Sequence, residues 1–115
     1  MRQLPDILGE RTEGGRVEID LRVPPELDCL QGHFPGRPIL PGVVQLDWSV
    51  RLARPRLGLQ GAFARAENLK FASIVWPRCE LTLGLELASP TRVRFRYFRE
   101  RRTYSSGTLV FGAPE

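Results

Sequence analysis

The sequence predicts an α+β fold in which one central, buried helix is wrapped by an antiparallel β-sheet. Several segments show the two-residue alternation of half-buried strands, whereas a single segment shows helical periodicity. That helical segment is apolar on almost all sides, so we expect it to have no free face. A chain of 115 residues is suited to one domain, which we expect to span residues 1–115.

The first strand is predicted at Val17–Val23, where apolar and charged residues alternate, and Pro24 and Pro25 end it. Residues 31–42 are rich in glycine and proline, which excludes a helix interior and predicts an ordered loop. The helix is predicted from Val43 to about Ala53, with Pro55 stopping it.

The remaining segments predict the rest of the sheet. Residues 61–71 read as an irregular strand, and clear alternation follows at 81–87, 93–97 and 104–111. Turns are expected at 88–91 and 99–102. Because these turns are short, neighbouring strands should pair in antiparallel fashion.

Composition restricts the class of protein. Apolar residues make up 42% and charged residues 26%, as in ordinary soluble domains, and no run approaches the roughly 20 apolar residues that span a bilayer. The N-terminus lacks the apolar core of a signal peptide, so we expect a cytoplasmic protein without membrane contact. A single histidine and two distant cysteines, Cys29 and Cys79, argue against a metal site and a disulfide framework.

The net charge of +4 comes almost entirely from arginine and suits an acidic partner. A nucleic-acid binder is one alternative, because Arg92, Arg94 and Arg96 share a strand face. Few exposed aromatic residues accompany them to stack on bases, so we rank this alternative last and expect no nucleic-acid partner.

Three features between residues 33 and 47 suggest chemistry. His33 lies in the constrained loop, Asp47 lies on the apolar helix, and Gly42 stands at the helix start, where backbone N–H groups are free. Each residue has a plainer, purely structural explanation. His33 would hydrogen-bond to a turn, Asp47 would form an ion pair with Arg51 at i+4, and Gly42 would simply begin a helix. Together they offer a base, an acid and an oxyanion donor, a set suited to proton abstraction beside a carbonyl.

The stretch that carries these features, GHFPGRPILPGV at residues 32–43, resembles the active-site signature of the hotdog-fold 3-hydroxyacyl-acyl carrier protein (ACP) dehydratases. In that family an acid follows the histidine by fourteen positions, as Asp47 follows His33 here. Residues 41–48 and 104–111 look like the subgroup linked to aryl-polyene clusters.

The resemblance implies a hotdog fold and a homodimer with an acyl tunnel at its interface, where His33 of one subunit faces Asp47 of the other. The implied reaction is dehydration of (3R)-3-hydroxyacyl-ACP to trans-2-enoyl-ACP in fatty-acid or aryl-polyene type biosynthesis, without a metal or other cofactor. His33 would take the C2 proton and Asp47 would assist departure of water. Gly42 would stabilise the thioester oxygen, with Val43 and Phe34 also at the substrate.

Two arginines add expectations. Arg37 is a candidate for docking the acidic carrier protein. Arg51 stands where the family usually has glutamine, and its charge would favour an ionised Asp47 over a proton-donating one. Two alternatives stay open: a hotdog acyl thioesterase, and a catalytically weak partner subunit of a heteromeric dehydratase. Chain length, pathway and double-bond isomerisation are not indicated by the sequence.

Overall fold

The computed structural model describes residues 3–27, 30 and 39–113. Its elements follow in the order β1 (Asp6–Glu13), β2 (Arg16–Arg22), α1 (Gly42–Arg56), β3 (Phe63–Phe71), β4 (Glu80–Ser89), β5 (Arg92–Arg99) and β6 (Arg102–Phe111). No helix among these residues has the length and apolar character needed to cross a membrane.

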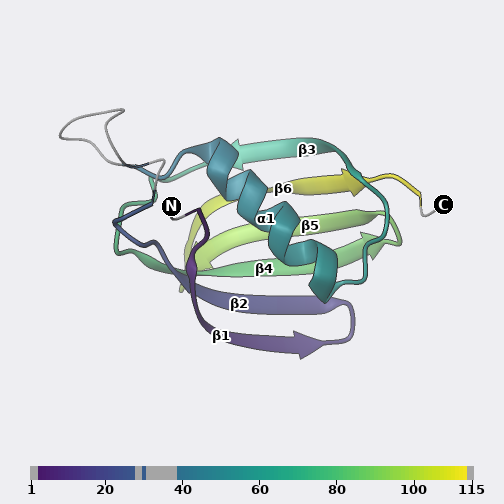
Figure 1. Cartoon of the computed structure of the whole chain (residues 1–115), viewed down its shortest axis with the longest axis horizontal. Coiled ribbons are helices and arrows are strands. Elements are labelled where there is room, and N and C mark those ends of the chain that lie inside the picture. The colour runs from purple at the N-terminus through teal and green to yellow at the C-terminus, as the bar shows by residue number, and fades with distance from the viewer. Residues whose placement is uncertain (1–2, 28–29, 31–38, 114–115) are drawn as a thin grey trace.

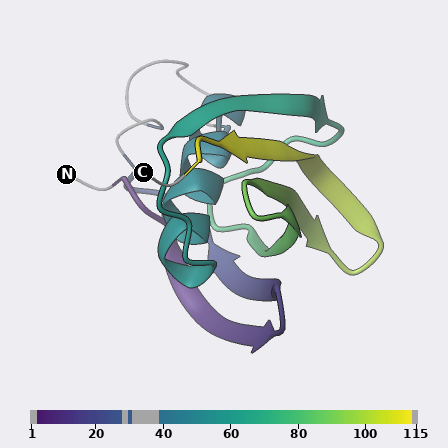
Figure 2. The ribbon, with the colours of Figure 1, turned by 90° about the vertical axis from the view of Figure 1, so that its right-hand side faces the viewer.

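The six strands form one sheet with the order β1-β2-β4-β5-β6-β3, and every neighbouring pair is antiparallel. The helix lies across one face of this sheet (Figure 1), and the sheet curves around one side of it (Figure 2). The predicted fold class is confirmed, as are the strands and turns after residue 61.

Alternation of apolar and polar residues fixes which face of each strand meets the helix. The core contains inward side chains of β2, β4 and β5 together with Trp48 and Leu52 of α1. The inward residues of these strands are Val17, Ile19, Leu21, Leu81, Leu83, Leu85, Val93, Phe95 and Tyr97. One continuous core therefore joins the helix to the middle of the sheet.

The prediction that the helix has no free face is wrong. Gln45, Trp48, Ser49, Leu52 and Ala53 are buried against the sheet. Exposed residues on the opposite side are spaced four apart, so they form a stripe along the helix: Val43, Asp47 and Arg51. The sheet covers only one side of α1 within a single chain, which leaves this stripe open.

The helix also runs past the predicted end, because Pro55 does not stop it. A proline removes one N–H donor, and here the loss falls in the last turn, where the helix is about to end. Leu57 N–H still reaches the Ala53 carbonyl at 2.9 Å, and Leu59 N–H reaches the Arg54 carbonyl at 3.0 Å. Gly58 then takes a positive φ of 66°, as is common just after a helix.

Strand β1 was not predicted from the sequence. It pairs with β2 through a turn at Gly14, whose φ is 61°, and its register shifts between Ile7 and Gly9. β1 has no alternating apolar pattern. Ion pairs to β2 help to hold it instead, such as the one between Arg11 and Asp20 at 2.8 Å. Strand β3 is irregular as predicted, with register shifts on either side of residues 65–67.

Candidate active site

The predicted site residues divide into two groups. Gly42, Val43, Asp47 and Arg51 all lie on α1. His33, Phe34 and Arg37 lie outside the described residues. The described part of the site is therefore the start of α1 and its first three turns.

The helix begins with free backbone donors. Pro41 precedes it in an extended conformation, with φ −63° and ψ 149°, and its carbonyl accepts hydrogen bonds from Val44 and Gln45 N–H at 3.1 and 3.2 Å. Gly42 and Val43 N–H have no acceptor among the described residues. These two groups, at the positive end of the helix dipole, can donate to a developing negative charge on a ligand oxygen.

Asp47 is not buried in the single chain, contrary to the prediction. Its side chain is 48% exposed, and Arg51 Nε lies 3.0 Å from its Oδ2. The predicted i,i+4 ion pair is thereby confirmed. An exposed pair of this kind contributes only about 0.3–0.5 kcal/mol to stability, so the fold does not depend on Asp47.

Gly42 has a close neighbour in the sheet. A Cβ atom added to Gly42 would stand 2.7 Å from the Phe71 ring, closer than real Cβ contacts. Phe71 ends β3, at one edge of the sheet. Glycine is therefore needed here for packing as well as for any approach of a ligand to the backbone.

Exposed apolar side chains surround the helix start, a set that we call the helix-start patch: Val43, Phe71, Ile74 and Trp76. Val43 is 72% exposed. Ile74 and Trp76 flank Val75, whose carbonyl accepts a hydrogen bond from Leu40 N–H at 2.8 Å. Large apolar side chains gathered around polar groups are typical of a surface that another molecule covers.

Sequence reasoning missed a buried polar network beneath the helix start. Gln45 and Ser49 on α1 face Tyr97 on β5 and Ser105 on β6, and all four side chains are almost inaccessible to solvent. Their hydrogen bonds range from 2.6 to 3.1 Å. The available signal was the pair of polar residues, four positions apart, on the helix face that also carries Trp48 and Leu52.

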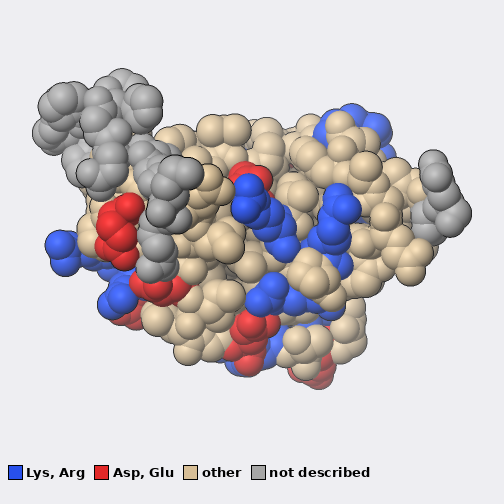
Figure 3. Space-filling view, viewed as in Figure 1, with Lys and Arg blue, Asp and Glu red and all other residues tan. Residues whose placement is uncertain are grey.

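Basic side chains lie over α1 on the face that carries Asp47 (Figure 3). Arg56 pairs with Glu10 at 2.8 Å, whereas Arg54 has no acidic partner among the described residues and lies 5.9 Å from the centre of the Phe111 ring. This face therefore presents positive charge at the last turn of α1, the end of the helix opposite the helix-start patch.

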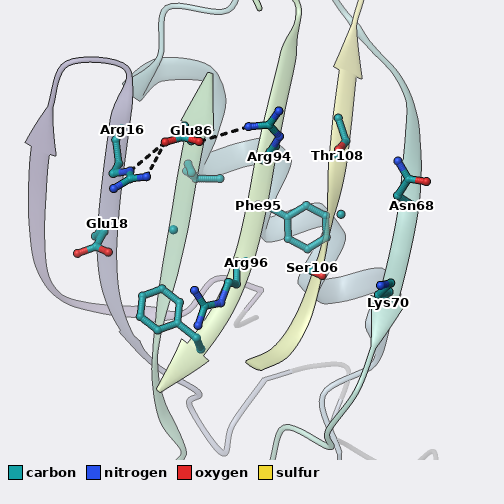
Figure 4. Close-up of a pocket in the computed structure, with 14 residues that line it drawn as sticks. Arg16, Glu18, Asn68, Lys70, Glu86, Arg94, Phe95, Arg96, Ser106 and Thr108 are labelled. Atoms are coloured by element: carbon teal, nitrogen blue, oxygen red, sulfur yellow. Dashed lines mark hydrogen bonds and ion pairs between the residues drawn. The ribbon is translucent and has the colours of Figure 1, made fainter. Parts of the chain in front are cut away.

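The opposite face of the sheet carries a groove of about 510 Å³, lined by residues of β2, β4, β5, β6 and β3 (Figure 4). None of the predicted site residues that the structure describes lines it. Glu86 lies 2.6 Å from Arg16 and 3.5 Å from Arg94, and Arg96 stacks on Phe98 at 4.4 Å. Two of these arginines thus share one carboxylate and the third stacks on a ring, while Lys70 also lines the groove.

Comparison with known proteins connects this geometry to a family. The model of the ApeI-like family, described as ApeI dehydratase, matches residues 9–108. The chain is 36% identical to a 3-hydroxyacyl-ACP dehydratase FabZ of Novosphingobium aromaticivorans, over 95% of the chain and 70% of that relative. It is 35% identical to FabZ of Erythrobacter litoralis, but spans only 62% of that relative's length.

Two solved structures share the fold over nearly their whole length. The dehydratase heterocomplex ApeI:P from Xenorhabdus doucetiae contains a chain with a TM-score of 0.86 and 30% identity, with 95% of this chain and 98% of that one covered. An uncharacterized protein from Erwinia carotovora subsp. atroseptica gives a TM-score of 0.79 and 32% identity, with 95% and 96% covered.

Proposed function

The chain belongs to the ApeI-like dehydratase family, and we propose that it removes water from a (3R)-3-hydroxyacyl group carried on ACP, giving the trans-2-enoyl thioester. One observation supports this most directly. Asp47 is presented on the open face of α1, little more than a turn after the free N–H groups of Gly42 and Val43. An acid and an oxyanion donor are thereby held on one rigid element.

The proposed mechanism divides the reaction among three groups. Neutral His33 accepts the C2 proton, and the electron pair moves toward the thioester carbonyl. Gly42 N–H stabilises the charge that develops on that oxygen. Asp47 assists departure of the 3-hydroxyl as water, either with its own proton or through a bound water. We propose that no metal or other cofactor takes part, because proton transfers and hydrogen bonds account for every step.

We propose a homodimer as the working form. Strand β3 lies at an edge of the sheet and pairs only with β6 among the described residues. The helix-start patch lies beside this edge, since Phe71 is the last residue of β3. A second copy covering both would bury the apolar side chains and enclose Asp47, whose half-exposed position is otherwise unsuited to excluding water from the reaction.

A heteromeric assembly is the second candidate. The solved structure with a TM-score of 0.86 belongs to a dehydratase heterocomplex, ApeI:P, so that protein assembles with a second, different chain. In that arrangement this chain would need a second dehydratase-like protein to complete its sites. Turnover by the purified chain alone favours the homodimer, whereas turnover only after addition of a paralogue favours the heteromer.

Carrier docking is proposed on the basic face around α1. Carrier proteins are acidic, so Arg54 and the predicted docking residue Arg37 would attract them toward the site. We propose the cytoplasm as the location; Cys79 has no disulfide partner among the described residues, as is usual there.

The test of the proposed function is incubation of purified protein with (3R)-3-hydroxyacyl-ACP, followed by mass spectrometry of the intact carrier. Loss of one water from the carrier-bound chain is the expected result. Release of the acyl chain as a free acid would instead identify a thioesterase.

A further inference from the structure

We propose that Gln45 is a positioning residue that fixes the direction of the Gly42 N–H, and that Ser105 anchors the Gln45 side chain in place. The inference rests on the proposed function, because it concerns the group assigned to stabilise the thioester oxygen. It adds two residues that lie beneath the site without touching the substrate.

The Gln45 side chain connects the sheet to the residue before the helix. Ser105 Oγ donates to Gln45 Oε1 at 2.6 Å, and Gln45 Nε2 donates to the Leu40 carbonyl at 3.2 Å. Only one orientation of the amide pairs both ends, since a flipped amide would place its oxygen against the Leu40 carbonyl oxygen. The Leu40 carbonyl, which can only accept, therefore selects this orientation, and the Ser105 hydroxyl anchors the other end of the amide.

Gln45 controls two successive peptide planes. Its side chain holds the carbonyl of the Leu40–Pro41 peptide, and its backbone N–H holds the Pro41 carbonyl at 3.2 Å. The Pro41 carbonyl and Gly42 N–H belong to the same planar trans peptide, so fixing one fixes the direction of the other. Leu40 is also held at its N–H by Val75. Leu40 is thus held at both its N–H and its carbonyl, and the segment that leads into Gly42 is fixed in place.

The sheet supports this arrangement through a single row of residues. Tyr97, Ser105 and Phe71 are direct cross-strand neighbours on β5, β6 and β3. Tyr97 Oη donates to the Gln45 carbonyl at 2.7 Å, and the Phe71 ring meets Gly42. Burial raises the pKa of the Tyr97 phenol well above its ordinary value, so Tyr97 remains a donor at neutral pH.

Burial makes these contacts rigid. Gln45 is 3% exposed and Ser105 is fully buried. A polar group left unpaired at such a place costs about 1–3 kcal/mol, so alternative arrangements of the amide are strongly disfavoured. A network of this kind can hold a backbone donor within the narrow tolerance that catalysis needs.

Ser49 offers a matched control within the same network. Its Oγ lies 2.9 Å from the Gln45 carbonyl and 3.1 Å from Tyr97 Oη, and it is fully buried like Ser105. It bonds neither Leu40 nor the Gln45 side chain. Removing the Ser49 hydroxyl therefore weakens the network without releasing the helix start.

The experiment compares Gln45→Met, Ser105→Ala and Ser49→Ala in the full chain. Gln45→Met and Ser105→Ala are expected to lower kcat about tenfold or more with little change in KM, because misplaced donors lose transition-state stabilisation. Ser49→Ala should lower the thermal midpoint as much as Ser105→Ala does, yet keep kcat within about twofold. The amide signal of Gly42 in ¹H–¹⁵N spectra should shift in the first two variants only.

Three outcomes would overturn the inference: an unmoved Gly42 signal in Ser105→Ala, unchanged kcat in that variant, or an equal loss of kcat in Ser49→Ala. Should Gln45→Met fail to fold, Ser105→Ala still decides. The Gly42 signal is measured without substrate, so it tests the inference even if the wild-type chain proves inactive, which would contradict the proposed function instead.

Discussion

Asp47 and Arg51 form an ion pair on the open face of α1, with Arg51 Nε 3.0 Å from Asp47 Oδ2 and both side chains about half exposed. The carboxylate that we assign to catalysis therefore has a partner within its own chain. Because the pair is exposed, its contribution to folding is small, and the two residues can be changed without loss of structure.

Asp47→Asn should abolish dehydration, with a loss of about 100-fold or more, because general acid–base groups contribute on that order. Arg51→Gln should change the rate less than about tenfold, since an exposed pair is worth at most about 1 kcal/mol. Steady-state rates and urea unfolding check both variants. Equal losses of activity in the two, or unfolding of either, would contradict these roles.

The interface proposal predicts that Ile74→Glu yields a folded monomer without activity. Ile74 is 52% exposed in the single chain, so a charge there is tolerated by the fold but not by a covered surface. Leu8→Glu is the matched control, because Leu8 is 50% exposed on β1, at the opposite edge of the sheet. Light scattering that finds both variants dimeric would place the interface elsewhere.

A shared site predicts complementation between two inactive variants. If His33 of one subunit faces Asp47 of the other, His33→Ala and Asp47→Ala homodimers are each inactive. Mixed under conditions that exchange subunits, they should form heterodimers with one intact site and recover measurable turnover. No recovery despite subunit exchange, verified by native mass spectrometry, would show that the two residues act within one chain.

The Gly42–Phe71 contact predicts coupled effects on stability. Gly42→Ala should reduce the free energy of unfolding by about 1 kcal/mol, near the low end for overpacking because the half-exposed Phe71 ring can shift. In a Phe71→Ala background the clash is absent, and the same change should be neutral or stabilising, as alanine favours helix. A double-mutant cycle by urea unfolding that finds no coupling would reject this packing role.

Local pattern was sufficient for much of the fold. Alternation at Leu81–Leu87 and Val93–Tyr97 predicted β4 and β5, because inward and outward residues differ in kind along these strands. It failed for β1, where Leu8 is exposed and Arg11 pairs with Asp20 on the neighbouring strand. Such a strand is stabilised by contacts that no local window contains.

As with the fold, part of the candidate site could be predicted from the sequence and part could not. Loop composition and spacing pointed to Gly42 and Asp47, but the exposure of Asp47 depends on how far the sheet wraps the helix. The network beneath Gly42 joins Gln45 to Tyr97 and Ser105, which lie 52 and 60 positions away in the sequence. Those contacts become visible only once the strands are arranged in space.

A time course of intact-carrier mass spectrometry on (3R)-3-hydroxyacyl-ACP, with wild type and Asp47→Asn at equal concentration, tests whether the chain is a dehydratase that acts through Asp47. We expect progressive loss of one water with wild type, approach to an equilibrium mixture of hydroxyacyl and enoyl carrier, and no change with Asp47→Asn. An unaltered substrate mass with folded, dimeric wild-type protein, or equal conversion by both proteins, would contradict it.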